Sequence, residues 1–114
     1  MSEIHLDHEV LNALQEIMED EYPLLLDTFL CDSEERLRQL HKVDDPRQLV
    51  ATAHSFKGSS SNMGAIRLAE LCHQLELRAQ GSSLRGIEQL VGEIDGEFAI
   101  VRQLCEQERQ RFHC

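Results

Sequence analysis

The last third of the chain carries an apolar repeat that fits only a long helix. From residue 84 onward, apolar side chains recur at alternating steps of three and four: Leu84, Ile87, Val91, Ile94, Phe98, Val101 and Cys105. This spacing places every member on one stripe of an α-helix, as in a seam between packed helices. No segment shows the period of two that a half-buried strand needs. We therefore expect an all-α protein.

Two helices are predicted before residue 45. The first begins after an N-cap, Asp7, with Leu6 and Leu11 placed to form a hydrophobic staple. A break at Tyr22-Pro23 ends it and starts the second helix, with Pro23 at the tolerated first position. Their expected buried stripes are Val10, Leu11, Leu14, Ile17 and Met18 in the first helix, and Leu26, Phe29, Leu30, Ser33, Leu37 and Leu40 in the second.

Two more helices are predicted between residues 45 and 81. Asp45-Pro46 starts one, with Gln48 completing a capping-box pattern, and Gly64 ends it. The next covers about residues 65–80, before a turn at 81–83. Its stripe is Ala65, Leu68, Leu71, Cys72, Leu75 and Ala79. Because the connections are short, neighbouring helices should be antiparallel. The expected architecture is an up-and-down antiparallel four-helix bundle with an additional short N-terminal helix, forming a single domain over residues 1–114.

Composition limits the class of partner. Asp and Glu outnumber Lys and Arg by 21 to 11, for a formal charge of −10. Such a charge repels nucleic acid and anionic membranes, so we expect protein partners, no nucleic acid and no membrane. The four cysteines form no CxxC motif, and neither an apolar leader nor a membrane-spanning run is present. These features favour a reduced, cytoplasmic protein, with three cysteines in helix interiors and Cys114 exposed.

The helix after Asp45 has two different faces. At about 100° per residue, one stripe is apolar or small and should face the core: Leu49, Ala53, Phe56, Ser60 and Met63. His54 lies on the opposite face, with Lys57, Gly58 and Ser61 beside it. A histidine on a helix surface usually has no function. Here, however, a glycine that costs helix stability leaves space beside the ring, and a lysine supplies positive charge. An anionic adduct on the imidazole would need both.

A carboxylate should face His54 from the next helix. If Gly64 marks the turn of an antiparallel hairpin, the level of His54 corresponds to residues 75–76. Leu75 belongs to the core stripe, whereas Glu76 lies at its edge. Glu76 could accept a hydrogen bond from Nδ1–H of His54 and leave Nε2 as the nucleophile. An ordinary solvated glutamate is an equally good interpretation of the sequence alone.

The run AHSFKGSSSNMGAIRLAELCHQLE, residues 53–76, resembles the histidine-containing phosphotransfer (HPt) domain of two-component phosphorelays. The family pattern is a histidine with an apolar residue at +2, Lys-Gly at +3 and +4, a small residue at +5, Gly at +10, and a Leu-x-x-Leu-Cys-x-x-Leu-Glu tail. The matching positions are His54, Phe56, Lys57, Gly58, Ser59, Gly64, Leu68, Leu71, Cys72, Leu75 and Glu76. Phe56 stands where leucine is commoner.

The resemblance implies a function and a set of site residues. His54 would carry a phosphoryl group on Nε2, Lys57 would neutralise it, Gly58 would give clearance and Glu76 would orient the ring. His73 is a weaker candidate for the same site. The partners implied are receiver domains of hybrid sensor kinases and response regulators, which supply the acidic pocket and Mg²⁺. The chain would then be a monomeric, free-standing carrier that needs no cofactor and has no ATP-binding or autokinase activity.

A docking surface should surround His54. On the same helix face we expect Arg47, Val50 and Ser61 to contribute. From the following helix we expect Glu70, His73 and Leu77. A small, partly apolar patch with a polar rim suits the weak, transient binding that a relay requires.

Two other functions share features with this sequence. Glu70-x-x-His73 has the spacing used in di-iron bundles, but only one such motif is present and both residues should face outward; His5-x-x-His8 has no further ligands nearby. A metal site is therefore not expected. The remaining alternative is a helical interaction adaptor that binds receiver domains without being phosphorylated. Such an adaptor has no need of His54, Lys57 and Gly58 at this spacing.

Overall fold

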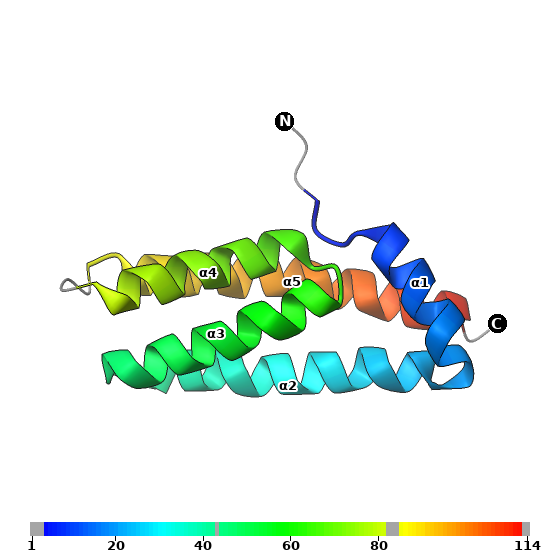
Figure 1. Cartoon of the computed structure of the whole chain (residues 1–114), viewed down its shortest axis with the longest axis horizontal. Helices are drawn as coiled ribbons and strands as arrows, with labels where there is room; N and C mark the ends of the chain where they lie inside the picture. Colours follow the sequence, from blue (N-terminus) through cyan, green and yellow to red (C-terminus); the bar gives the residue numbers. More distant parts are fainter. Residues whose placement is uncertain (1–3, 43, 82–84, 113–114) are drawn as a thin grey trace.

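Four long helices run alternately up and down, and a shorter helix lies at one end of them (Figure 1). The computed structural model describes residues 4–42, 44–81 and 85–112. Its helices are α1 (His8–Met18), α2 (Tyr22–Lys42), α3 (Pro46–Asn62), α4 (Ile66–Gln80) and α5 (Ile87–Phe112), with a short 3-10 helix η1 (Glu19–Glu21) between α1 and α2. No strand occurs within these ranges. The expected all-α, up-and-down bundle with an additional N-terminal helix is confirmed.

The bundle closes because each long helix packs against two others. α3 lies between α2 and α4, and α5 lies between α4 and α2, in a body of 49 × 30 × 20 Å. The predicted stripes of α3 and α4 are buried throughout. So is the α5 seam from Val91 to Cys105, while Ile87 is half-buried and Leu84 lies outside the described residues. Burial of each large apolar side chain contributes about 1.5–3 kcal/mol, which holds the polar faces of α3 and α4 outward.

Two expectations about side-chain burial and one about a helix start were wrong. Ile17 is 74% exposed, because the short helix α1 covers only one end of the bundle and buries only Leu11 completely. Cys31 is exposed on the outer face of α2, whereas Cys72 and Cys105 are buried as expected. Pro23 is the second residue of α2, because the break between the helices comes earlier, at η1. The expected position of Cys114 lies outside the described residues.

The caps of α1 and α3 follow the sequence. The carboxylate of Asp7 accepts a hydrogen bond from the backbone N–H of Glu9 at 3.0 Å, and that of Asp45 accepts one from the N–H of Arg47 at 3.0 Å. Each cap satisfies one of the backbone donors that the first turn of a helix leaves without a partner. The start of α3 is therefore fixed at the residue that the sequence indicates.

The turn between α3 and α4 sets the register of these two helices. Gly64 has φ +75°, a conformation that favours glycine. A Cβ at this position would lie 3.0 Å from Cβ of Val10 and 3.2 Å from the carbonyl oxygen of Asp7. The N-terminal segment packs here: the N–H of Asp7 donates to the Gly64 carbonyl at 2.8 Å, and the N–H of Arg67 donates to the Ile4 carbonyl at 3.2 Å. The tight turn places the middle of α3 beside the middle of α4.

Candidate functional site

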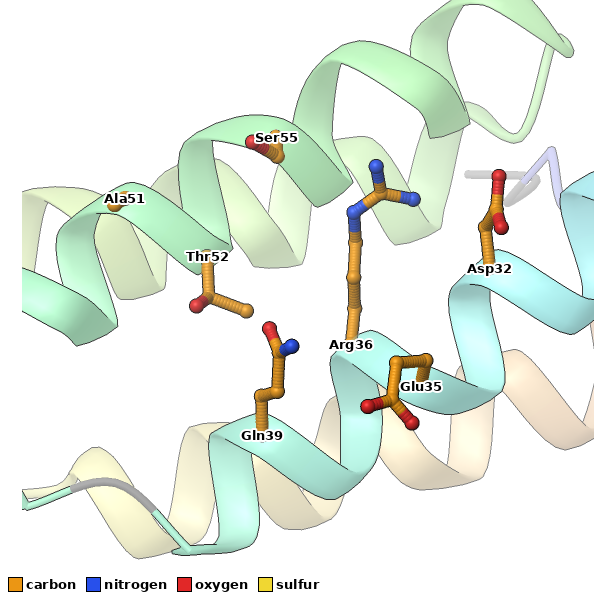
Figure 2. A pocket seen from close by; sticks show the side chains of 7 residues that line it. All are labelled: Asp32, Glu35, Arg36, Gln39, Ala51, Thr52 and Ser55. Atoms are coloured by element: carbon orange, nitrogen blue, oxygen red, sulfur yellow. The ribbon is translucent and has the colours of Figure 1, made fainter.

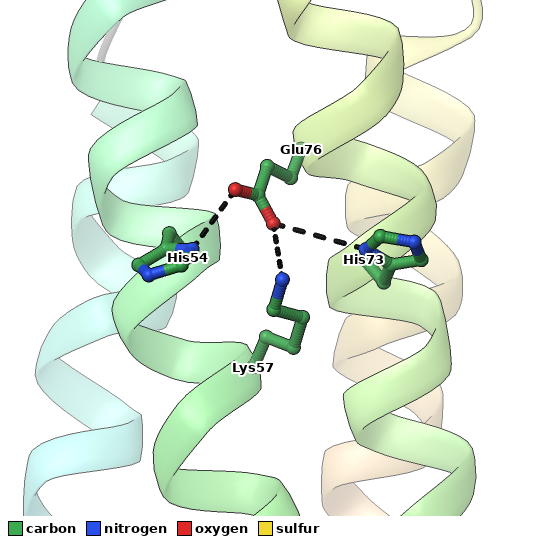
Figure 3. Close-up of polar contacts among 4 residues, drawn as sticks. All are labelled: His54, Lys57, His73 and Glu76. Atoms are coloured by element: carbon green, nitrogen blue, oxygen red, sulfur yellow. Dashed lines mark hydrogen bonds and ion pairs between the residues drawn. The ribbon is translucent and has the colours of Figure 1, made fainter.

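α3 presents His54 to solvent, with Lys57 on the same helix and Glu76 and His73 on α4 (Figure 3). The side chain of His54 is 66% exposed, and Ala53 and Phe56, close to it in the chain, are completely buried. Phe56 packs edge-on against Phe98 of α5, with ring centroids 6.5 Å apart. The core contacts of α3 therefore fix the direction in which His54 points.

Glu76 of α4 connects three basic side chains. Its Oε2 lies 2.9 Å from Nδ1 of His54, and its Oε1 accepts a hydrogen bond from Nζ of Lys57 at 2.8 Å. Nδ1 of His73 lies 3.8 Å from the same Oε1, within ion-pair distance but beyond a hydrogen bond. The hydrogen bond expected between His54 and Glu76 is present. The carboxylate is largely buried, with 11% of its side chain exposed, so water competes little for these contacts.

The charge on Glu76 decides the tautomer of His54. The hydrogen bond from Lys57 lowers the pKa of Glu76 below its usual range; the hydrogen bond from His54 acts in the same direction, against the effect of burial. The carboxylate is therefore ionised at neutral pH and can only accept hydrogen bonds. Nδ1 of His54 must then be the donor. In a neutral imidazole this leaves the lone pair on Nε2, the ring nitrogen that does not face Glu76.

Gly58 lies one turn beyond His54 on the same face. No atom of the described residues outside its own helix lies within 4 Å of the place where its Cβ would sit. The free protein thus has no packing reason for glycine at this position, although glycine costs about 0.5–1 kcal/mol in a helix interior. The space beside the ring suits a group bound to His54 or a partner surface in contact with it.

The residues expected at the docking surface lie on both sides of His54. Arg47, Ser61 and Glu70 are exposed, and Val50 is half-buried. His73 and Leu77 of α4 are also exposed, with Leu77 at 54%. Arg47 and Val50 line a depression of about 410 Å³ together with the end of α4 at residues 79–81. Arg47 and Val50 therefore lie where the start of α3 meets the end of α4.

No residue of α2 is expected at the site from the sequence pattern. In the structure, a groove of about 400 Å³ lies between α2 and α3, on the face of α3 that carries Ala51 and Ser55 (Figure 2). Arg36 extends from α2 into the space between the helices, and Ser55, which follows His54, lines the opposite side. The only sequence signal for Arg36 is its place between two residues of the buried stripe, Ser33 and Leu37. Periodicity alone does not give such a position a role.

The histidines and glutamate with metal-ligand spacing, His5, His8, Glu70 and His73, do not form a cluster of ligands. Within residues 4–42, 44–81 and 85–112, no group of three or more His, Cys, Asp or Glu side chains could hold a metal ion. Across the same ranges, every helix is too short or too polar to cross a bilayer.

Comparisons with known proteins agree with this geometry. The Hpt domain family model matches residues 24–110. The chain is similar to the crystal structure of histidine-containing phosphotransfer protein B (HptB) from Pseudomonas aeruginosa PAO1, with a TM-score of 0.92 and 57% sequence identity over 96% of this chain and 98% of that one. A comparison with curated protein sequences gave no significant match. The family match spans more than half of the chain, so this protein belongs to the Hpt domain family.

Proposed function

We propose that this protein relays a phosphoryl group between the receiver domains of hybrid sensor kinases and response regulators through a phosphohistidine at His54. Hpt proteins are phosphocarriers, not kinases, and they interact with receiver domains in phosphorelays. We further propose that one Hpt domain occupies residues 1–114 and acts as a monomer without ATP-binding or autokinase activity. A cytoplasmic location accords with free thiols at Cys31, Cys72 and Cys105.

The arrangement around His54 supports direct transfer. Nε2 attacks the phosphorus of the receiver's aspartyl phosphate, an N–P bond forms, and the P–O bond to the aspartate breaks, releasing a carboxylate. The imidazole gains positive charge while Nδ1 keeps its proton. Ionised Glu76 stabilises that charge through the 2.9 Å contact with Nδ1. The reverse sequence delivers the group to the next receiver, so the same residues serve both directions.

Lys57 has two possible partners during this cycle. It is bound to Glu76 at 2.8 Å in the structure, with 29% of its side chain exposed. When a phosphoryl group adds negative charge one turn away, on His54, Lys57 can turn toward it and offset that charge. Glu76 then keeps its contact with Nδ1 of His54.

One observation carries the proposal: an exposed histidine whose Nδ1 is held by a buried carboxylate, so that Nε2 is free beside open space. The test is incubation with phosphorylated receiver domains, followed by measurement of acid-labile, base-stable label on the protein. We expect label on the wild type and on His73→Gln, and none on His54→Gln. Equal label on wild type and His54→Gln would reject His54 as the acceptor.

The same experiment separates the carrier from the adaptor. An adaptor would bind the receiver domain, as measured by titration, while no label appears on the wild type. Incubation with ATP alone, without any kinase, should leave the protein unlabelled. Label under that condition would contradict the proposed absence of autokinase activity.

A further inference from the structure

Arg36 lines the groove between α2 and α3, and one nitrogen of its guanidinium is buried beneath the groove without a partner in the described residues. The groove is flanked by Arg36 and Gln39 on α2 and by Ala51 and Ser55 on α3 (Figure 2). Nη1 of Arg36 is buried, and no hydrogen-bond acceptor lies within reach of it in the part of the chain that the structure describes. A buried donor without an acceptor loses its hydration and gains nothing in return, so it destabilises the free protein.

The nearest carboxylates do not relieve this deficit. Glu35 also lines the groove but accepts its hydrogen bonds from Arg38, through Nε at 3.0 Å and through Nη2. Asp32 lies one turn before Arg36 on the same helix and also lines the groove. Two carboxylates, Asp32 and Glu35, and two guanidiniums, Arg36 and Arg38, which binds Glu35, give this region a formal charge of zero. An incoming carboxylate would gain no net attraction there, so a neutral acceptor suits the groove.

Small residues of α3 lie between this groove and His54. Ala51 precedes His54 by three residues, Ser55 follows it directly, and Gly58 lies one turn beyond. All three side chains are small. On the α4 side of His54, by contrast, Lys57 fills the space toward Glu76, and Leu77 is 54% exposed. A partner seated over His54 can therefore approach α3 most closely on the side of α2.

We propose that Arg36 is a binding contact for receiver domains, donating a hydrogen bond to a neutral oxygen acceptor, a main-chain carbonyl, that a receiver loop inserts into this groove. This inference rests on the proposed function and adds a surface on α2 to it. On docking, the guanidinium turns from its buried position toward the groove, and its unpaired nitrogen gains an acceptor. The Ser55 hydroxyl and the Asp32 carboxylate can accept backbone N–H groups of the same loop.

The test compares two arginines on one helix. Arg36→Met and Arg38→Met remove the same charge, but Arg38 is 65% exposed and pairs with Glu35. We expect Arg36→Met to weaken binding of a receiver domain at least about tenfold, the loss of one charge-assisted hydrogen bond. Arg38→Met should stay within about twofold, because its ion pair with Glu35 is exposed and contributes little. Phosphoramidate phosphorylates imidazoles without a receiver, so it should label His54 equally in both variants.

A second variant tests the groove without removing Arg36. Gln39 is exposed on α2, so Gln39→Trp should fill the groove, keep the fold and weaken receiver binding while leaving phosphoramidate labelling unchanged. If Arg36→Met lowers thermal stability but binds the receiver with wild-type affinity, Arg36 has a purely structural role and the inference is overturned. Wild-type receiver affinity in Gln39→Trp would also overturn it. If phosphoramidate labels the wild type but the phosphoryl group passes to none of the receiver domains tested, the proposed function fails together with this inference.

Discussion

Two histidine–carboxylate pairs in this protein have nearly the same geometry but different surroundings. Nδ1 of His54 lies 2.9 Å from Glu76, and Nδ1 of His5 lies 2.6 Å from Glu97. In both pairs the carboxylate is largely buried, with 11% and 6% of its side chain exposed. In the first pair the imidazole is 66% exposed, whereas in the second it is 30% exposed. A buried carboxylate under a histidine thus occurs twice and does not by itself identify a site.

The difference lies in the second partner of the carboxylate and in the space around the ring. Glu76 also binds Lys57, and a glycine lies one turn beyond His54. Glu97 binds His5 of the N-terminal segment, which packs against the α3–α4 turn. The first pair has a cation and open space that an anionic adduct could use. The second connects two distant parts of the chain, and we expect it to contribute to stability.

Replacement of each carboxylate by glutamine should affect a different property: the transfer rate for Glu76 and the stability for Glu97. We expect Glu76→Gln to slow phosphoryl transfer about tenfold to a hundredfold, because the amide cannot balance the charge that develops on His54. Glu97→Gln should keep the wild-type transfer rate and lower the free energy of unfolding by about 1 kcal/mol. The measurements are single-turnover transfer from a phosphorylated receiver and urea unfolding. Slower transfer in both variants to the same extent would remove the distinction between the two pairs.

Replacement of Lys57 should have the next largest effect. Lys57→Ala removes the cation that can offset the phosphoryl charge, so we expect transfer to slow about fivefold to tenfold. Lys57→Arg should recover part of the rate because it restores the charge. Helicity, measured by circular dichroism, should be unchanged, since the side chain lies outside the core. Lys42→Ala, at the last residue of α2, is the matched control and should transfer at the wild-type rate.

Gly58 can be compared with a glycine on α5. At Gly58 and Gly96 alike, a Cβ would meet no atom of the described residues within 4 Å outside its own helix. Each change to alanine should therefore raise the free energy of unfolding by about 0.4–1 kcal/mol. Only Gly58→Ala should slow transfer, by about twofold to threefold, because only this methyl group lies beside His54. Equal transfer rates in the two variants would show that clearance at residue 58 has no role.

Much of the fold could be predicted because local patterns determine it. The apolar seam of α5 and the caps at Asp7 and Asp45 each depend on residues close in the chain. The hydrogen bond between His54 and Glu76 could also be predicted, since a tight turn at Gly64 fixes which residues of α3 and α4 face each other. Where one short turn connects two helices, helical geometry alone gives the contacts across them.

Contacts between helices that are distant in sequence could not be found in this way. Nothing near Glu97 in the chain indicates that it is buried under His5, 92 residues away. The exposure of Ile17 depends on where α1 packs on the bundle, which its own amphipathic pattern does not fix. Arg36 borders a groove whose other side belongs to α3, so its position requires the relative rotation of both helices.

The smallest expected effect is a pH dependence that separates Glu76 from an exposed carboxylate. The contact with Lys57 keeps the pKa of Glu76 below its usual 4.5 in the folded protein. The unfolded chain therefore takes up this proton at higher pH than the folded one. The stability that ionised Glu76 contributes is complete above about pH 5 and is lost as the pH falls through the folded pKa. Urea unfolding of wild type and Glu76→Gln should thus give a difference that shrinks as the pH falls below about 5.

Glu35, whose pKa is lowered by Arg38, is the control. Its pair is exposed and screened by water, so Glu35→Gln should show a weaker trend. A difference for Glu76→Gln that stays constant down to pH 3 would contradict the lowered pKa of Glu76, and with it the ionised carboxylate that sets the tautomer of His54.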